Sequence, residues 1–241
     1  MQIERQQSRP NPRAALIAGA VLILALQRLI PMGRQLLYPF TLLSTWVHEM
    51  GHGVTALLCG GRFERLDIFA DASGLALSAV VPGFRQALTA AGGLLGPPFV
   101  GALCLLLARR MPRLVLSVLA AALLLSLPLW VRTSVGWITV GGLGLGIGLL
   151  ARILSDGGRI FFAQLLGLLL ALDTLARGDY LFMRSASVGG SVRPSDVAGI
   201  AQVMGGPVVM WGGVIALLSA LLLIIGLYSV LRSDRPQPVH G

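Results

Sequence analysis

Three polar side chains lie close together in a segment that is otherwise apolar enough to cross a membrane. They are His48, Glu49 and His52. If the segment is a helix, the two histidines lie one turn apart, so both imidazoles project from one face and can share a metal ion. Three ionisable groups at membrane depth are costly unless something binds them. We therefore prefer a metal-binding role to a chance match on a core helix.

Zinc suits this pair of imidazoles, because a catalytic zinc ion takes three protein ligands and keeps its fourth position for water. The pKa of a water bound to zinc falls to about 7. A carboxylate beside the metal can take that proton and so generate a hydroxide nucleophile. The spacing predicts a hydrolytic centre with one zinc ion per chain, in which His48 and His52 bind the metal and Glu49 is the general base.

The composition indicates a protein that lies in a lipid bilayer. Of the 241 residues, 55% are hydrophobic and only 12% are charged, which excludes a disordered chain and an ordinary soluble domain. All 19 basic residues are arginines, and the net charge is +9. These arginines cluster in short gaps between apolar runs, where they are expected to contact phospholipid headgroups rather than nucleic acid.

The apolar runs predict an all-α polytopic membrane protein with about six to seven transmembrane helices. We expect a single domain over residues 1–241, with polar tails at 1–13 and 232–241. Two isolated cysteines, Cys59 and Cys104, are expected to be buried and inert. The predicted spans cover about residues 14–30, 36–59, 87–108, a run that ends at 130, 137–153, 160–176 and 207–231.

Two polar segments interrupt the apolar runs. Residues 66–79 alternate between apolar and polar side chains around an Asp-Ala-Ser-Gly stretch at 71–74, which predicts a small β-hairpin at the membrane surface. An irregular interfacial loop is the alternative. In the second segment, residues 177–206, Ser195 and Asp196 give a helix-start signal. The apolar face that follows predicts a short helix lying on the membrane.

Glycine and proline mark two of the spans. The run Gly96-Pro97-Pro98 predicts a kink or a break in the third span, because proline frees backbone carbonyls of the preceding turn. Such a break is tolerated only against protein or a water-filled cavity, so this stretch could form a wall of the catalytic chamber or serve helix packing. The glycine-rich run at residues 141–148 favours close packing of helices.

A third metal ligand must come from elsewhere in the chain. The remaining histidine, His240, lies in the terminal tail. Most other carboxylates, including Asp196, lie in polar segments, which leaves Asp156 and Asp173. If every apolar run crosses the membrane once, Asp173 lies at the depth of the histidines and Asp156 roughly 25 Å away. This argument favours Asp173, whereas a re-entrant Gly-Pro-Pro segment would favour Asp156.

The run His48-Glu49-Met50-Gly51-His52 resembles the His-Glu-x-Gly-His pattern of the site-2 protease group of intramembrane zinc metalloproteases. The chain is most similar to the small bacterial branch of that group, which lacks extra soluble domains. One departure is that the larger group carries a ligand in a Leu-Asp-Gly motif, which Ser155 interrupts before Asp156 and which lacks its glycine after Asp173. Weaker similarities lie at residues 60–62, 71–74, 91–97, 171–173 and 195–212.

The resemblance implies a zinc-dependent intramembrane endopeptidase that hydrolyses peptide bonds in or near membrane-spanning segments of other proteins. Its partners would be a membrane-spanning protein substrate and the lipid bilayer, and its place a bacterial plasma membrane, which it crosses several times. A helical substrate must unwind before its carbonyls are accessible. The hairpin at residues 66–79 could then pair with the unwound strand.

Two other classes of protein remain as alternatives. A transporter or channel would spread polar residues over several spans, whereas here they concentrate in the second and sixth. A non-catalytic metal protein is the other. Glu49-x-x-His52 is half of a di-iron motif, but the sequence contains no second Glu-x-x-His to complete it.

Overall fold

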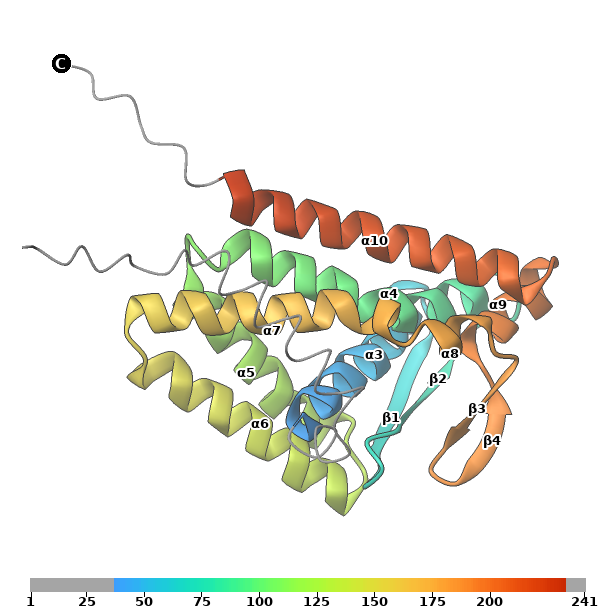
Figure 1. Cartoon of the computed structure of the whole chain (residues 1–241). Coiled ribbons are helices and arrows are strands. Elements are labelled where there is room, and N and C mark those ends of the chain that lie inside the picture. The colour runs from blue at the N-terminus through green and yellow to red at the C-terminus, as the bar shows by residue number, and fades with distance from the viewer. Residues whose placement is uncertain (1–36, 233–241) are drawn as a thin grey trace, which may run out of the picture.

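The computed structural model describes residues 37–232, which form eight helices and two small β-hairpins (Figure 1). The predicted all-α polytopic membrane fold is confirmed. The predicted span at residues 14–30 and the tail at 1–13 lie outside the described residues, as does the tail beyond 232. The helices are α3 (Tyr38–Leu58), α4 (Phe84–Leu107), α5 (Pro112–Leu129), α6 (Ser134–Ile153), α7 (Asp156–Ala176), α8 (Gly178–Phe182), α9 (Asp196–Met204) and α10 (Val208–Arg232).

Five described helices are long and apolar enough to span a membrane, namely α4, α5, α6, α7 and α10. Their bounds match the predicted spans to within a few residues. Helix α3 has 21 residues and matches the predicted second span, but it is not among the five. The polar side chains of His48, Glu49 and His52 lower its mean hydropathy.

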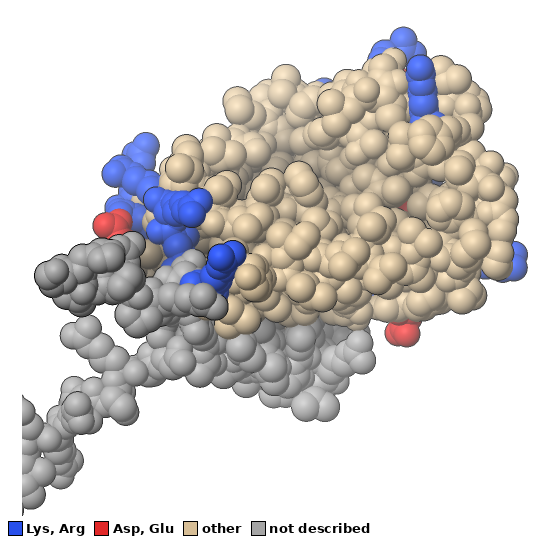
Figure 2. Space-filling view, turned by 90° about the horizontal axis from the view of Figure 1, so that it is seen from above, with Lys and Arg blue, Asp and Glu red and all other residues tan. Residues whose placement is uncertain are grey.

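Helix α3 crosses the bundle obliquely beside α4 and also contacts α6 and α7 (Figure 1). Helix α4 also packs against α7 and α10, and α5 pairs with α6. Apolar side chains such as Leu43, Leu123 and Leu170 fill the core, whereas others such as Ile138 and Leu145 are exposed on outward faces. Figure 2 shows the charged side chains at the margins of one face, with a broad uncharged surface between them. Such a surface suits contact with lipid.

Helix α4 continues through its two prolines, so of the two predicted outcomes, a kink or a break, the break does not occur. Both Pro97 and Pro98 lie inside the continuous helix. Proline lacks an N–H group, so Pro98 cannot donate to the carbonyl oxygen of Leu94, one turn earlier. The hydroxyl of Thr174 on α7 donates to that oxygen instead, at 2.9 Å. The neighbouring helix thus supplies the hydrogen bond that the proline removes.

The predicted hairpin is present as strands β1 (Arg62–Ile68) and β2 (Gly74–Ala79), which pair antiparallel. A second hairpin, β3 (Ser185–Val188) with β4 (Ser191–Pro194), was not predicted. Its strands have only four residues each, too few to give a clear alternating pattern. The signal available in the sequence was Gly189-Gly190, a pair typical of two-residue hairpin turns, and both have positive φ here.

The glycine-rich run on α6 serves helix packing at one position. A Cβ atom added to Gly144 would lie 2.8 Å from Cγ of Leu124 on α5, so the two helices approach closely there. At Gly142 and Gly146 an added Cβ would meet nothing within 4 Å. Close packing therefore accounts for Gly144 and not for these two neighbours.

Candidate metal centre

The two histidines of α3 face each other across one helical turn, as the sequence predicts. Their Nε2 atoms are 3.1 Å apart, and the ring planes are nearly perpendicular. Helix α4 lies directly against this turn. A Cβ atom added to Gly51 would lie 2.3 Å from the carbonyl oxygen of Gly92, and one added to Gly93 would lie 2.2 Å from Nε2 of His52. Only glycine permits this approach of the two helices.

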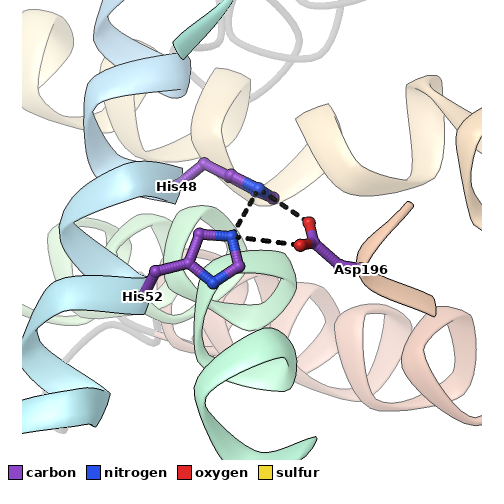
Figure 3. Close-up of side chains that lie close together, drawn as sticks. All are labelled: His48, His52 and Asp196. Atoms are coloured by element: carbon purple, nitrogen blue, oxygen red, sulfur yellow. Dashed lines mark hydrogen bonds and ion pairs between the residues drawn. The ribbon is translucent and has the colours of Figure 1, made fainter. Parts of the chain in front are cut away.

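The carboxylate that joins the histidines belongs to Asp196 (Figure 3). Its Oδ2 atom is 3.1 Å from Nε2 of His48, and its Oδ1 atom is 3.4 Å from Nε2 of His52. One ligand atom from each of these three residues lies within 4.8 Å of the others. Asp196 is the first residue of α9, whose start is fixed by Ser195, because the Oγ of Ser195 accepts a hydrogen bond from the N–H of Ala198.

Neither aspartate that the sequence argument retained lies in this cluster. The carboxylate of Asp173 pairs with Nε of Arg177 at 3.1 Å, although Asp173 lines the same cavity as His48 and Glu49. Asp156 pairs with Arg159 at the other end of α7. The depth argument thus correctly placed Asp173 nearer to the histidines than Asp156. However, the carboxylate that lies beside the histidines in the structure is that of Asp196.

Asp196 was set aside because polar segments were assumed to stay at the membrane surface. Instead, α9 packs its apolar face against α4 and α10, burying Val197 and Ile200. The short helix was predicted correctly, but its apolar face is covered by protein. The signal that could have identified Asp196 was its place at the start of a helix whose apolar face needs a protein partner.

The residues around the cluster orient its ligand atoms. The carbonyl oxygen of Thr89 lies 2.8 Å from Nδ1 of His52. Because a carbonyl can only accept, Nδ1 carries the proton and Nε2 offers a lone pair to a metal. The hydroxyl of Tyr180 donates to Oδ2 of Asp196 at 3.0 Å. Burial raises the pKa of Tyr180 above its usual range, which keeps this phenol protonated and able to donate.

The charge of the cluster fits a cation. Burial by itself would raise the pKa of Asp196, but the positive charge of the neighbouring imidazoles, when they are protonated, outweighs it and holds that pKa below its usual range. The carboxylate is therefore ionised. Its two oxygen atoms lie 3.1 Å from Nε2 of His48 and 3.4 Å from Nε2 of His52. Two imidazole nitrogens and a carboxylate oxygen make a donor set that suits a divalent metal ion.

Glu49 lies beside the cluster and is 7% exposed. Its Oε2 atom accepts a hydrogen bond of 2.7 Å from the N–H of Ala76 in β2. No described residue donates a hydrogen bond to its Oε1 atom. Glu49 and His48 line a cavity of about 330 Å³ that is also walled by Leu94 of α4 and by both hairpins. Gly96, Pro97 and Pro98 are not among the residues that line this cavity, so α4 contributes to its wall through Leu94 and not through the stretch predicted for that role.

Comparison with known proteins identifies the family of the chain. A family model described as Peptidase M50B-like matches residues 14–226. Searches of curated proteins and of solved structures found no match. The family match confirms the resemblance to the site-2 protease group and covers most of the chain, including all three residues of the cluster and Glu49. The chain therefore belongs to the Peptidase M50B-like family of intramembrane metalloproteases.

Proposed function

We propose that this chain is a zinc-dependent endopeptidase that hydrolyses peptide bonds in or near membrane-spanning segments of other proteins, in a bacterial plasma membrane. One observation carries the proposal. The ligand atoms of His48, His52 and Asp196 lie within 4.8 Å of one another, beside the buried Glu49. In an integral multi-pass membrane protein, that centre faces a cavity enclosed by the protein's own helices and hairpins.

The proposed ligands of one zinc ion are His48, His52 and Asp196, with Asp196 in the place first given to Asp173. When bound, zinc supplies Lewis-acid activation of a water molecule and of the scissile carbonyl. The hydrogen bond between Thr89 and His52 fixes the tautomer that leaves Nε2 available. The hydroxyl of Tyr180 holds the Asp196 carboxylate in place.

Glu49 is proposed as the general base and then the proton donor. The N–H of Ala76 holds Oε2, which leaves Oε1 to take a proton from the attacking water. The same atom can then give the proton to the leaving amine. Because the side chain is buried and held by β2, it stays close to the cavity throughout both transfers.

Strand β2 is proposed to bind the substrate as a strand. The N–H of Ala76 points at Glu49, so the edge of β2 that is not paired with β1 faces the centre. An unwound segment that pairs along this edge would gain main-chain hydrogen bonds and lie beside the catalytic carboxylate. This supports cleavage of segments that can leave the helical state locally.

The test is the variant Glu49→Gln in detergent or nanodiscs, with labelled single-span peptides as substrates. We expect the rate to fall by about 10²–10⁴-fold, the usual contribution of a general base. Metal analysis should still find about one zinc per chain, because Glu49 is not a ligand. A variant that cleaves at the wild-type rate would contradict the role of Glu49. A wild-type protein without metal would contradict the zinc centre.

A further inference from the structure

The cavity of about 330 Å³ that His48 and Glu49 line is called the metal cavity below. Several buried or half-buried hydroxyl groups line it, and all but one of them have a hydrogen-bond partner. Thr45 donates to Ala72, Ser73 to Asp71, Thr174 to Leu94, and Tyr180 to Asp196, at distances of 2.6–3.0 Å. The exception is Ser44, which is 3% exposed and whose Oγ finds no partner among the described residues. A buried hydroxyl without a partner costs free energy, so it calls for a ligand.

Ser44 stands on the metal-binding face of α3. It precedes His48 by four residues, as His48 precedes His52, so all three lie on one stripe of the helix. Ser44 lines both the metal cavity and an adjoining space of about 30 Å³ between α3 and α7. Leu170 and Asp173 of α7 line that second space as well. Ser44 therefore lies where the metal cavity continues into the α3–α7 contact.

We propose that Ser44 binds the substrate backbone, its hydroxyl donating a hydrogen bond to a carbonyl of the unwound segment. This inference rests on the proposed proteolytic function. Unwinding a helix in a membrane leaves carbonyls without donors, and water is scarce there. Ser44 offers a donor that is also unsatisfied. Pairing the two groups removes two desolvation penalties at once.

The position of Ser44 indicates which substrate residue it contacts. One helical turn separates it from His48, which is about 5–6 Å along the axis of α3. An extended chain advances roughly 3.3 Å per residue. The carbonyl bound by Ser44 therefore belongs to a residue about two positions from the scissile bond. The substrate class is a membrane span that unwinds over at least this length, as spans containing glycine or proline do more readily.

The test compares Ser44→Ala with Ser219→Ala. Ser219 is a matched control, because its hydroxyl is also buried without a partner among the described residues, but it lies on α10 and lines neither cavity. With a glycine-containing single-span peptide, we expect Ser44→Ala to raise KM by about 3–10-fold with little change in kcat. Ser219→Ala should leave both constants unchanged. Zinc content and the unfolding temperature check that both variants fold.

Binding without cleavage gives a second readout. In the Glu49→Gln background, Ser44→Ala should weaken binding of the labelled peptide by a similar factor, measured by fluorescence anisotropy. Should Ser44→Ala fail to fold, Ser44→Cys keeps the size with a weaker donor, and an intermediate KM is expected. An unchanged KM, or an equal rise in both alanine variants, overturns the role of Ser44 while proteolysis stands. A wild-type protein that neither cleaves nor binds such peptides overturns both proposals.

Discussion

The Asp196 carboxylate lies beside the imidazoles of His48 and His52, although it follows His48 by 148 residues in the chain. The residues next to the cluster each make a hydrogen bond that orients one of its side chains or Glu49. Thr89 sets the tautomer of His52, Tyr180 orients Asp196, and Ala76 holds Glu49. Asp173 lies in the same cavity but is engaged with Arg177. At the scale of residues, the choice between two aspartates can therefore be tested directly.

Replacing the proposed ligand, Asp196→Ala, should remove zinc, whereas Asp173→Ala should keep about one zinc per chain. The expected loss of affinity for Asp196→Ala exceeds the roughly 10–100-fold that loss of a ligand's hydrogen-bond partner costs. Metal content after dialysis and a competition titration with a chelator would measure both. The reverse result, with zinc lost only from Asp173→Ala, would restore Asp173 as the third ligand.

At the scale of elements, the contact between α3 and α4 sets how closely the backbone of α4 approaches His52, one of the proposed metal ligands. The glycines of both helices bring backbone against backbone at Gly51 and Gly92, and Gly93 lies against the His52 ring. The prolines one turn later would weaken α4, but Thr174 of α7 replaces the missing donor. Helix α4 is thus both a close wall of the centre and a part of the packed bundle.

The variant Gly93→Ala should lose zinc while the fold remains. The added methyl would lie 2.2 Å from Nε2 of His52, and His52 is held by Thr89, so the imidazole must leave its place. Gly146→Ala on α6 is the matched control, because its added methyl meets nothing within 4 Å. Zinc content and circular dichroism would separate the two. Equal zinc binding by both variants would show that His52 does not require this space.

At the scale of the whole molecule, the two hairpins lie on the same side of the bundle (Figure 1). Residues of both hairpins line the cavity beside the proposed metal centre. The turn of the first hairpin meets the turn of the second, since the N–H of Gly189 donates to Oγ of Ser73 at 3.0 Å. Helix α9 follows the second hairpin and carries Asp196. A metal ion held by α3 and α9 would therefore tie the 177–206 segment to the bundle.

Removing the metal should loosen that segment. With free zinc at 100 times its Kd, binding stabilises the folded chain by about 2.7 kcal/mol, so a chelator should lower the unfolding temperature. Trypsin should then cut faster after Arg184, which is exposed. Added zinc should reverse both effects, and Asp196→Ala should respond to neither treatment. A chelator without effect on the wild-type protein would argue against a metal link between the helices.

Local patterns in the sequence predict much of this fold. Helical periodicity places His48 and His52 on one face whatever surrounds them, because two residues four positions apart share a face of any α-helix. Alternation and a turn signal predict β1 and β2, and apolar runs predict the spanning helices. The second hairpin escaped prediction because its four-residue strands are too short for a periodic pattern.

The sequence alone predicted the proposed metal-binding pair and the proposed general base, and it determined the membrane class, because each follows from neighbouring residues. The third carboxylate was decided only by the tertiary structure. Asp196, Asp173 and Asp156 are all chemically competent, and no local period distinguishes them. Asp196 is selected by the packing of α9 against α4, which buries Val197 and Ile200. This packing brings the first residue of α9 to two histidines that are far away in the chain.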